Sequence, residues 1–224
     1  MLQDIVLVFR WLMLASGILL GASISLSDLR AKQGQTLLLG FGPAKLRFAM
    51  VASLAALMFT LIAEMAIRSW LQYQAFAAGG PGQYLLPPHQ PISYFLNYAT
   101  FHFVLWRALG LALGVLVLAG LLVKWPKSAA LQQRLSIGEI YLLAFGIAAA
   151  GWPNLLVFIV AAAALYATIL FALTLWAFLR KQGAMPRFPV ALPLTLALIP
   201  ALLFGAPILD ALNLDFLRIS LFSF

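Results

Sequence analysis

The sequence predicts an all-α, polytopic integral membrane protein with about six transmembrane helices. Three observations carry this prediction: 64% of the 224 residues are hydrophobic, only 9% are charged, and the mean hydropathy is +1.03. A soluble domain carries roughly 25% charged residues, so this chain has too few to cover a globule in water. The composition therefore excludes a soluble enzyme and a nucleic-acid-binding domain, and the expected surroundings are a lipid bilayer.

Residue types that hold cofactors are scarce. The chain has no cysteine and two histidines, His89 and His102. Disulfides, thiolate zinc sites and iron–sulfur clusters are thereby excluded, and a haem held by paired histidines is disfavoured. The sequence therefore predicts no metal and no other cofactor.

A helix of about 20 apolar residues crosses a bilayer, and such segments follow one another along the chain. The stretch 94–123 is too long for one span, so it is divided into an interfacial piece, 94–106, and a span. The first span lacks a basic leader, since its first charge is Asp4, and is expected to be retained rather than cleaved. The six predicted spans are residues 5–26, 48–67, 107–123, 137–150, 155–179 and 188–204.

The connections predict one membrane domain over residues 1–224. An outer loop and interfacial segment covers about 68–106, and its runs of Gly and Pro are typical of turns. The fourth and fifth spans are joined by a tight turn at Trp152-Pro153-Asn154. A tail over about 207–224 is expected on the membrane surface, with a seventh crossing left open.

Basic residues orient these spans. Ten of the fourteen Lys and Arg residues lie in three alternate connections, 27–47, 124–136 and 180–187, whereas 71–93 has none. Because cytoplasmic loops are enriched in Lys and Arg, these three connections are expected inside and both termini outside. The net charge of +8 is attributed to this topology, in the bacterial inner (plasma) membrane.

Two acids, Asp28 and Glu139, lie at the predicted cytoplasmic side. Two facing carboxylates in a poorly solvated site share a proton, so that one acts as a base on water and the other as an acid. They are therefore the candidate catalytic pair. The structural alternative is that Asp28 pairs with Arg30 or caps a turn, and that Glu139 pairs with Arg134 or Lys127.

The segments around these acids carry recognisable motifs. The first runs Asp28-Leu29-Arg30-Ala31-Lys32-Gln33-Gly34-Gln35-Thr36, and the second runs Ser136-Ile137-Gly138-Glu139-Ile140-Tyr141-Leu142, with Gly151-Trp152 closing its helix. They resemble the type IV prepilin peptidases, which are membrane aspartyl peptidases, in the small form without a cysteine-rich domain. In that family the first motif is Asp-x-Arg, followed by basic residues and Ile-Pro-Asn. The second motif is Gly-x-Gly-Asp-x-Lys-Leu. Pro186-Arg187-Phe188-Pro189 is similar to the entry to its last span.

The resemblance implies the family's fold and places Asp28 and Glu139 at its catalytic positions. The motifs are degenerate, because Glu139, Ser136 and Tyr141 stand for aspartate, glycine and lysine. A carboxylate displaced by one methylene costs on the order of 10²-fold in rate. The expected function is that of a catalytically impaired relative serving as a subunit or assembly factor of a membrane complex. The alternative is an active endopeptidase that cleaves pilin-like leader peptides at the cytoplasmic face.

The expected partners are the bilayer and either other membrane subunits or a pilin-like substrate helix, and no nucleic acid. A small transporter is the weakest interpretation, because no polar residue lies near the midplane of a predicted span. Two Gly-xxx-Gly spacings, Gly17/Gly21 and Gly110/Gly114, predict faces where helices pack closely.

A second polar set maps towards the outer side. Glu64 and Arg68 are spaced to pair on one helix. Arg10 and Arg107 either extend to the membrane surface or join a buried cluster that binds an acidic group of a partner. His102 is expected to be a hydrogen-bonded helix residue rather than a ligand.

Overall fold

The computed structural model describes residues 2–33, 43–129, 132, 135–180 and 190–214, and for 2–3, 28–33 and 43–45 it describes the backbone alone. All regular structure in these ranges is helical, which confirms the predicted all-α class. The helices are α1 (Leu2–Gln33), α2 (Pro43–Ala77), η1 (Pro81–Leu85), α3 (Ile92–Ala99), η2 (Thr100–Val104), α4 (Leu105–Lys124), η3 (Trp125–Lys127), α6 (Ile137–Ala150), α7 (Asn154–Leu179), α8 (Ala191–Leu203) and α9 (Gly205–Ala211).

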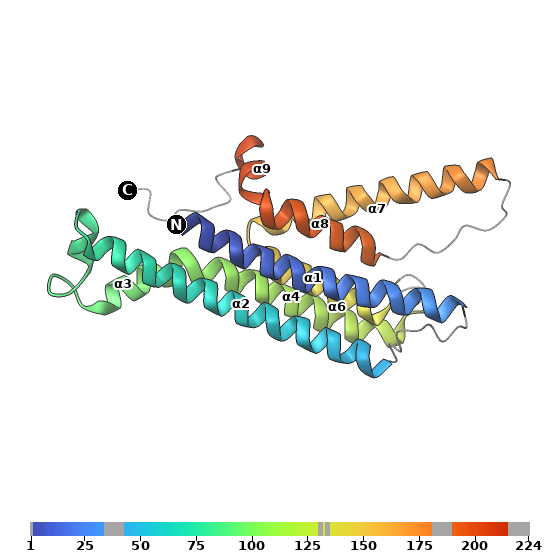
Figure 1. Cartoon of the computed structure of the whole chain (residues 1–224), viewed down its shortest axis with the longest axis horizontal. Helices are drawn as coiled ribbons and strands as arrows, with labels where there is room; N and C mark the ends of the chain where they lie inside the picture. The colour runs from blue at the N-terminus through green and yellow to red at the C-terminus, as the bar shows by residue number, and fades with distance from the viewer. Residues whose placement is uncertain (1, 34–42, 130–131, 133–134, 181–189, 215–224) are drawn as a thin grey trace.

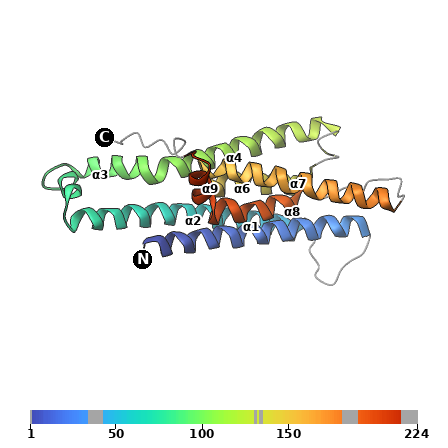
Figure 2. The ribbon, with the colours of Figure 1, turned by 90° about the horizontal axis from the view of Figure 1, so that it is seen from above.

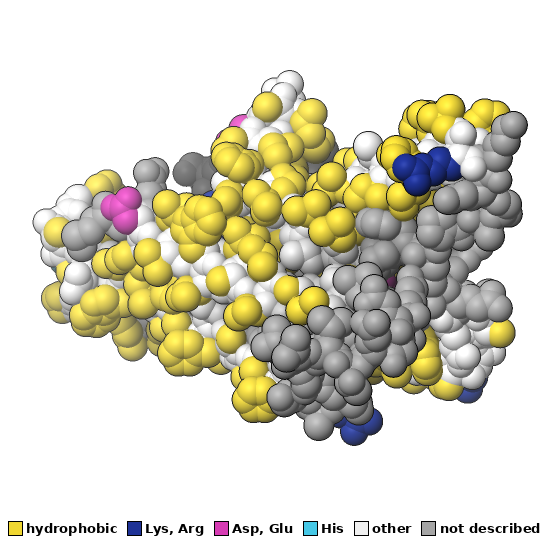
Figure 3. Space-filling view, turned by 45° about the vertical axis from the view of Figure 1, so that its right-hand side comes forward, with side chains coloured by type: hydrophobic (Ala, Val, Ile, Leu, Met, Phe, Trp, Pro, Cys, Tyr) yellow, Lys and Arg dark blue, Asp and Glu magenta, His cyan; other side chains and the backbone are white. Residues whose placement is uncertain are grey.

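Four helical stretches in the described part of the chain are long and apolar enough to cross a membrane. They are Asp4–Ser27, Leu46–Ala77, Ile92–Lys127 and Asn154–Leu179. Helices α8 and α9, which are bent by 73° at Phe204, make a fifth span if the pair is counted as one. Apolar side chains cover much of the face shown in Figure 3. These features agree with a multi-pass membrane protein, and six crossings stay a prediction.

The predicted interfacial piece, 94–106, and the predicted span, 107–123, are parts of one helix. Residues 92–127 form one continuous helical stretch, in which the π-helical turn η2 joins α3 to α4. A π turn accommodates an extra residue without ending a helix, so the interfacial piece and the span are continuous.

The outer loop begins later than predicted. Helix α2 continues to Ala77, because no Gly or Pro interrupts it before Gly79. Gly79 and Gly80 both have positive φ, which glycine adopts without steric cost, and they end the helix. The loop then folds back onto α2, where Leu86, Phe95 and Ala99 form a small buried cluster.

Helix α6 lies at the centre of the bundle, with α1, α2, α4, α7 and α8 around it (Figures 1 and 2). Eleven of its fourteen residues are buried. Helix α4 approaches it closely: a Cβ added at Gly114 would lie 2.7 Å from the Ala144 carbonyl oxygen. Helices α1 and α8 are also close at Gly21, where an added Cβ would meet the side chain of Thr195. Both predicted glycine spacings therefore serve packing within the chain.

The length of α6 sets a physical problem. Fourteen residues span roughly 21 Å, whereas the hydrocarbon core of a bilayer is about 30 Å thick. Glu139 near its start and Ala150 at its end are each 1% exposed, so the backbone groups at both ends of α6 lie away from solvent. Such groups need partners from within the protein.

Two candidate functional sites at the ends of helix α6

Asp28 lies near the end of α1, and its side chain is outside the described residues. Ile24, one turn earlier, packs against the start of α6, because a Cβ added at Gly138 would lie 3.0 Å from Ile24 Cγ1. The end of α1 and the start of α6 are therefore neighbours, as expected for the two predicted acids. The distance between the carboxylates of Asp28 and Glu139 stays untested.

Glu139 is 1% exposed and takes part in a capping box at the start of α6. The Ser136 hydroxyl accepts a hydrogen bond from the Glu139 backbone N–H at 3.2 Å. In return, Glu139 Oε2 accepts from the Ser136 N–H at 2.8 Å and from the Ser136 hydroxyl at 3.1 Å. This reciprocal pattern satisfies N–H groups that a helix start leaves without intrahelical partners.

The other oxygen of Glu139 reaches a second helix. Glu139 Oε1 accepts hydrogen bonds from the backbone N–H groups of Val190 and Ala191, the latter at 3.2 Å. These are the first amides of α8. One carboxylate thus caps two helices at once, and its negative charge lies at the positive end of both helix dipoles.

This arrangement differs from the ion pair with Lys127 that the sequence suggested for Glu139. Within the described residues the carboxylate forms no ion pair with Lys127, and Arg134 lies outside them. Four donors surround its two oxygens. The geometry is that of a buried cap joining two helix starts.

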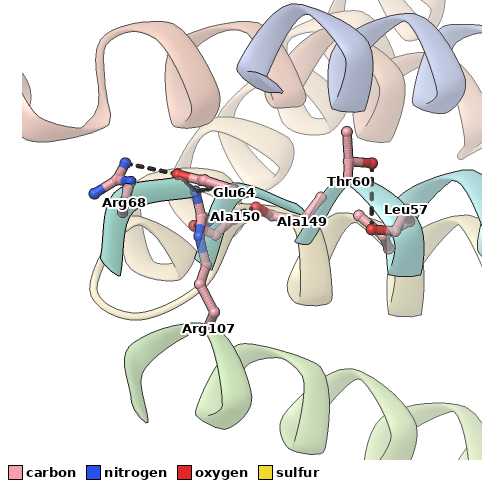
Figure 4. Close-up of polar contacts among 7 residues, drawn as sticks. All are labelled: Leu57, Thr60, Glu64, Arg68, Arg107, Ala149 and Ala150. Carbon is pink, nitrogen blue, oxygen red and sulfur yellow. Dashed lines mark hydrogen bonds and ion pairs between the residues drawn. The ribbon is translucent and has the colours of Figure 1, made fainter. Parts of the chain in front are cut away.

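The opposite end of α6 carries a charged cluster (Figure 4). Glu64 of α2 is 1% exposed and lies 2.6 Å from Arg68 Nη2, which confirms the predicted i, i+4 pair. Its two oxygens also accept hydrogen bonds from Arg107 Nη2 of α4, at 3.1 and 2.9 Å. Sequence reasoning missed the second pair, because the partners are 43 residues apart on different helices.

Arg107 also caps the C-terminal end of α6. Its Nη1 donates hydrogen bonds to the carbonyl oxygens of Ala149 and Ala150, at 3.0 and 3.2 Å. Gly151, the next residue, has a φ of 66°, and a Cβ added there would lie 3.0 Å from Arg107 Nη1, so a side chain at this position would be strained and would crowd the guanidinium. Arg107 is 14% exposed and does not simply extend to the membrane surface.

A pocket of about 320 Å³ adjoins this cluster. Arg10 of α1 lines it together with Arg68, Arg107 and Glu64, so the four charged residues predicted towards the outer side do meet. His102 lines it as well, and its Nδ1 is hydrogen-bonded to the Tyr98 carbonyl oxygen at 3.0 Å, as expected for a helix residue.

Comparison with known proteins yields no match to a family model, a curated protein or a solved structure.

Proposed function

We propose that this chain is a prepilin-peptidase-like protein of the bacterial inner membrane whose catalytic pair is impaired, and that it acts as a subunit or assembly factor of a membrane complex. One observation carries the proposal: both oxygens of Glu139 are occupied as the shared cap of α6 and α8. A general acid or base must reach the proton that it transfers, directly or through one water. A carboxylate that is 1% exposed and held by four donors is poorly suited to this role.

The replacement of the motif's aspartate fits the same interpretation. Glutamate is favoured at the third position of a helix that starts with Ser, because its longer side chain reaches back to the N-cap amide. Ser136 and Glu139 occupy these positions. The substitution is therefore explained by helix capping.

The outer segment supports a role as a subunit. Residues 68–106 extend α2 and form η1, α3 and η2, with their own buried cluster around Phe95. Large apolar side chains nearby, including Trp70, Tyr94 and Leu96, are exposed on this extension. Exposed apolar surface beyond the main bundle is typical of contacts with other membrane subunits or lipid.

A cleavage assay separates this proposal from an active endopeptidase. We expect the native chain, reconstituted with a pilin-like substrate that has a basic leader and an apolar helix, to give no more leader cleavage than empty vesicles. Asp28→Ala should behave as the native chain does. Robust cleavage that is abolished by both Asp28→Ala and Glu139→Gln would overturn the proposal and establish the endopeptidase, whose two acids do lie on neighbouring helices.

The proposed orientation puts the Glu139 end of α6 at the cytoplasm and both termini outside. The chain has no cysteine, so a single introduced cysteine reports one position. In intact spheroplasts, a membrane-impermeant maleimide should label Gln90→Cys but not Lys127→Cys. After lysis it should label both. Labelling of Lys127→Cys before lysis contradicts this topology.

A further inference from the structure

The arginine pocket at the outer end of α6 has an unbalanced charge. Three guanidinium groups, those of Arg10, Arg68 and Arg107, share it with the single carboxylate of Glu64. Glu64 is already committed to Arg68 and Arg107, so the described residues leave the pocket with two positive charges in excess. Charges in a poorly solvated site are costly unless they are paired. An anionic ligand would balance this charge.

The guanidinium groups of Arg10 and Arg68 indicate where in the pocket an anion would bind. Arg10 forms no hydrogen bond or ion pair with any described residue, yet it is close enough to Arg68, Arg107 and Glu64 to interact with their charges. Arg68 Nε is buried and has no hydrogen-bond partner in the described part of the chain. Arg10 and Arg68 come from different helices and line the same pocket, and the Arg68 side chain is 29% exposed, so the exposed guanidinium N–H groups of both can donate to one ligand.

A second hollow of about 580 Å³ adjoins the pocket. The two share Arg10, Arg68 and Phe103, and the second adds the apolar side chains of Val6 and Leu7. Asp4 also lines the second hollow, but it is exposed, so solvent screens its charge. A charged recess that continues into a partly apolar hollow suits an amphiphile with an anionic head.

The position along the membrane normal points to a lipid. Trp70 follows Arg68 by two residues on α2 and is 60% exposed, and exposed tryptophans of membrane helices lie at the level of the headgroups. Guanidinium groups bind phosphate through paired hydrogen bonds. We propose that Arg10 and Arg68 bind the phosphate of an anionic glycerophospholipid, beside the charge of Arg107.

The test uses the full chain purified in a neutral detergent, with thermal unfolding followed by tryptophan fluorescence. Phosphatidylglycerol should raise the melting temperature in a saturable manner, whereas zwitterionic phosphatidylcholine should not. Arg10→Gln should fold, since Arg10 has no partner among the described residues, and should need about tenfold more phosphatidylglycerol for half of the effect. Arg180→Gln, which removes a charge near the other end of the molecule, should titrate as the native chain does.

Three results would overturn the proposal. Equal stabilisation by phosphatidylcholine would show general solvation by lipid. An unchanged titration of Arg10→Gln would place the lipid elsewhere. Full, Arg10-dependent stabilisation by inorganic phosphate alone would assign the site to a free anion rather than to a lipid.

Discussion

Glu139→Ala is expected to lower the free energy of unfolding by at least about 3 kcal/mol, because it removes the acceptor of three backbone N–H groups on two helices. Those groups belong to Ser136, Val190 and Ala191. Each buried donor left without a partner costs about 1–3 kcal/mol. Unfolding of the detergent-solubilised protein in a denaturant titration, followed by the fluorescence of its six tryptophans, measures the change.

Ser136→Ala is the matched comparison. It removes the hydroxyl that caps the Glu139 N–H but leaves the carboxylate in contact with α8. Loss of such a cap costs about 1 kcal/mol. If Glu139→Ala is no more destabilising than Ser136→Ala, the carboxylate does not join the two helix starts, and a catalytic role for it becomes the better account. Glu139→Gln, which keeps one acceptor oxygen, should fall between the two.

The second large effect is expected at the other end of α6. Glu64→Gln leaves Arg68 and Arg107 without their carboxylate, and removal of one partner of a buried pair costs about 3–5 kcal/mol. The contact between Glu64 and Arg107 should appear as a coupling of at least about 1 kcal/mol in a double-mutant cycle with Arg107→Gln.

Arg10→Gln, studied without anionic lipid, provides the comparison for this cycle. Arg10 lines the same pocket but makes no ion pair with a described residue, so its removal should not lower stability. A loss as large as that of Glu64→Gln would mean that any charge change in the pocket destabilises the fold. A coupling energy near zero between Glu64 and Arg107 would mean that Arg107 stabilises the fold only through its hydrogen bonds to the carbonyl oxygens at the end of α6.

Individual elements show which features the sequence predicts well. The fourth predicted span, 137–150, coincides with α6, since Ser136 and Gly151 mark its ends with familiar capping chemistry. The fifth span begins within one residue of α7, after the predicted turn at Trp152. The boundary predicted at residue 106 does not interrupt the helix, because apolar composition gives no sign of the π turn that joins α3 to α4.

The sequence by itself determined the class of this protein. Its composition predicts a lipid environment, and its apolar segments predict helices. The four-residue spacing of Glu64 and Arg68 places them on one face of α2. Only the tertiary structure decided what the charged residues do. The contacts from Glu139 to α8 and from Arg107 to Glu64 join residues 43 to 52 positions apart. Such pairs form because both ends of α6 are buried, so the polar groups there must find partners on neighbouring helices.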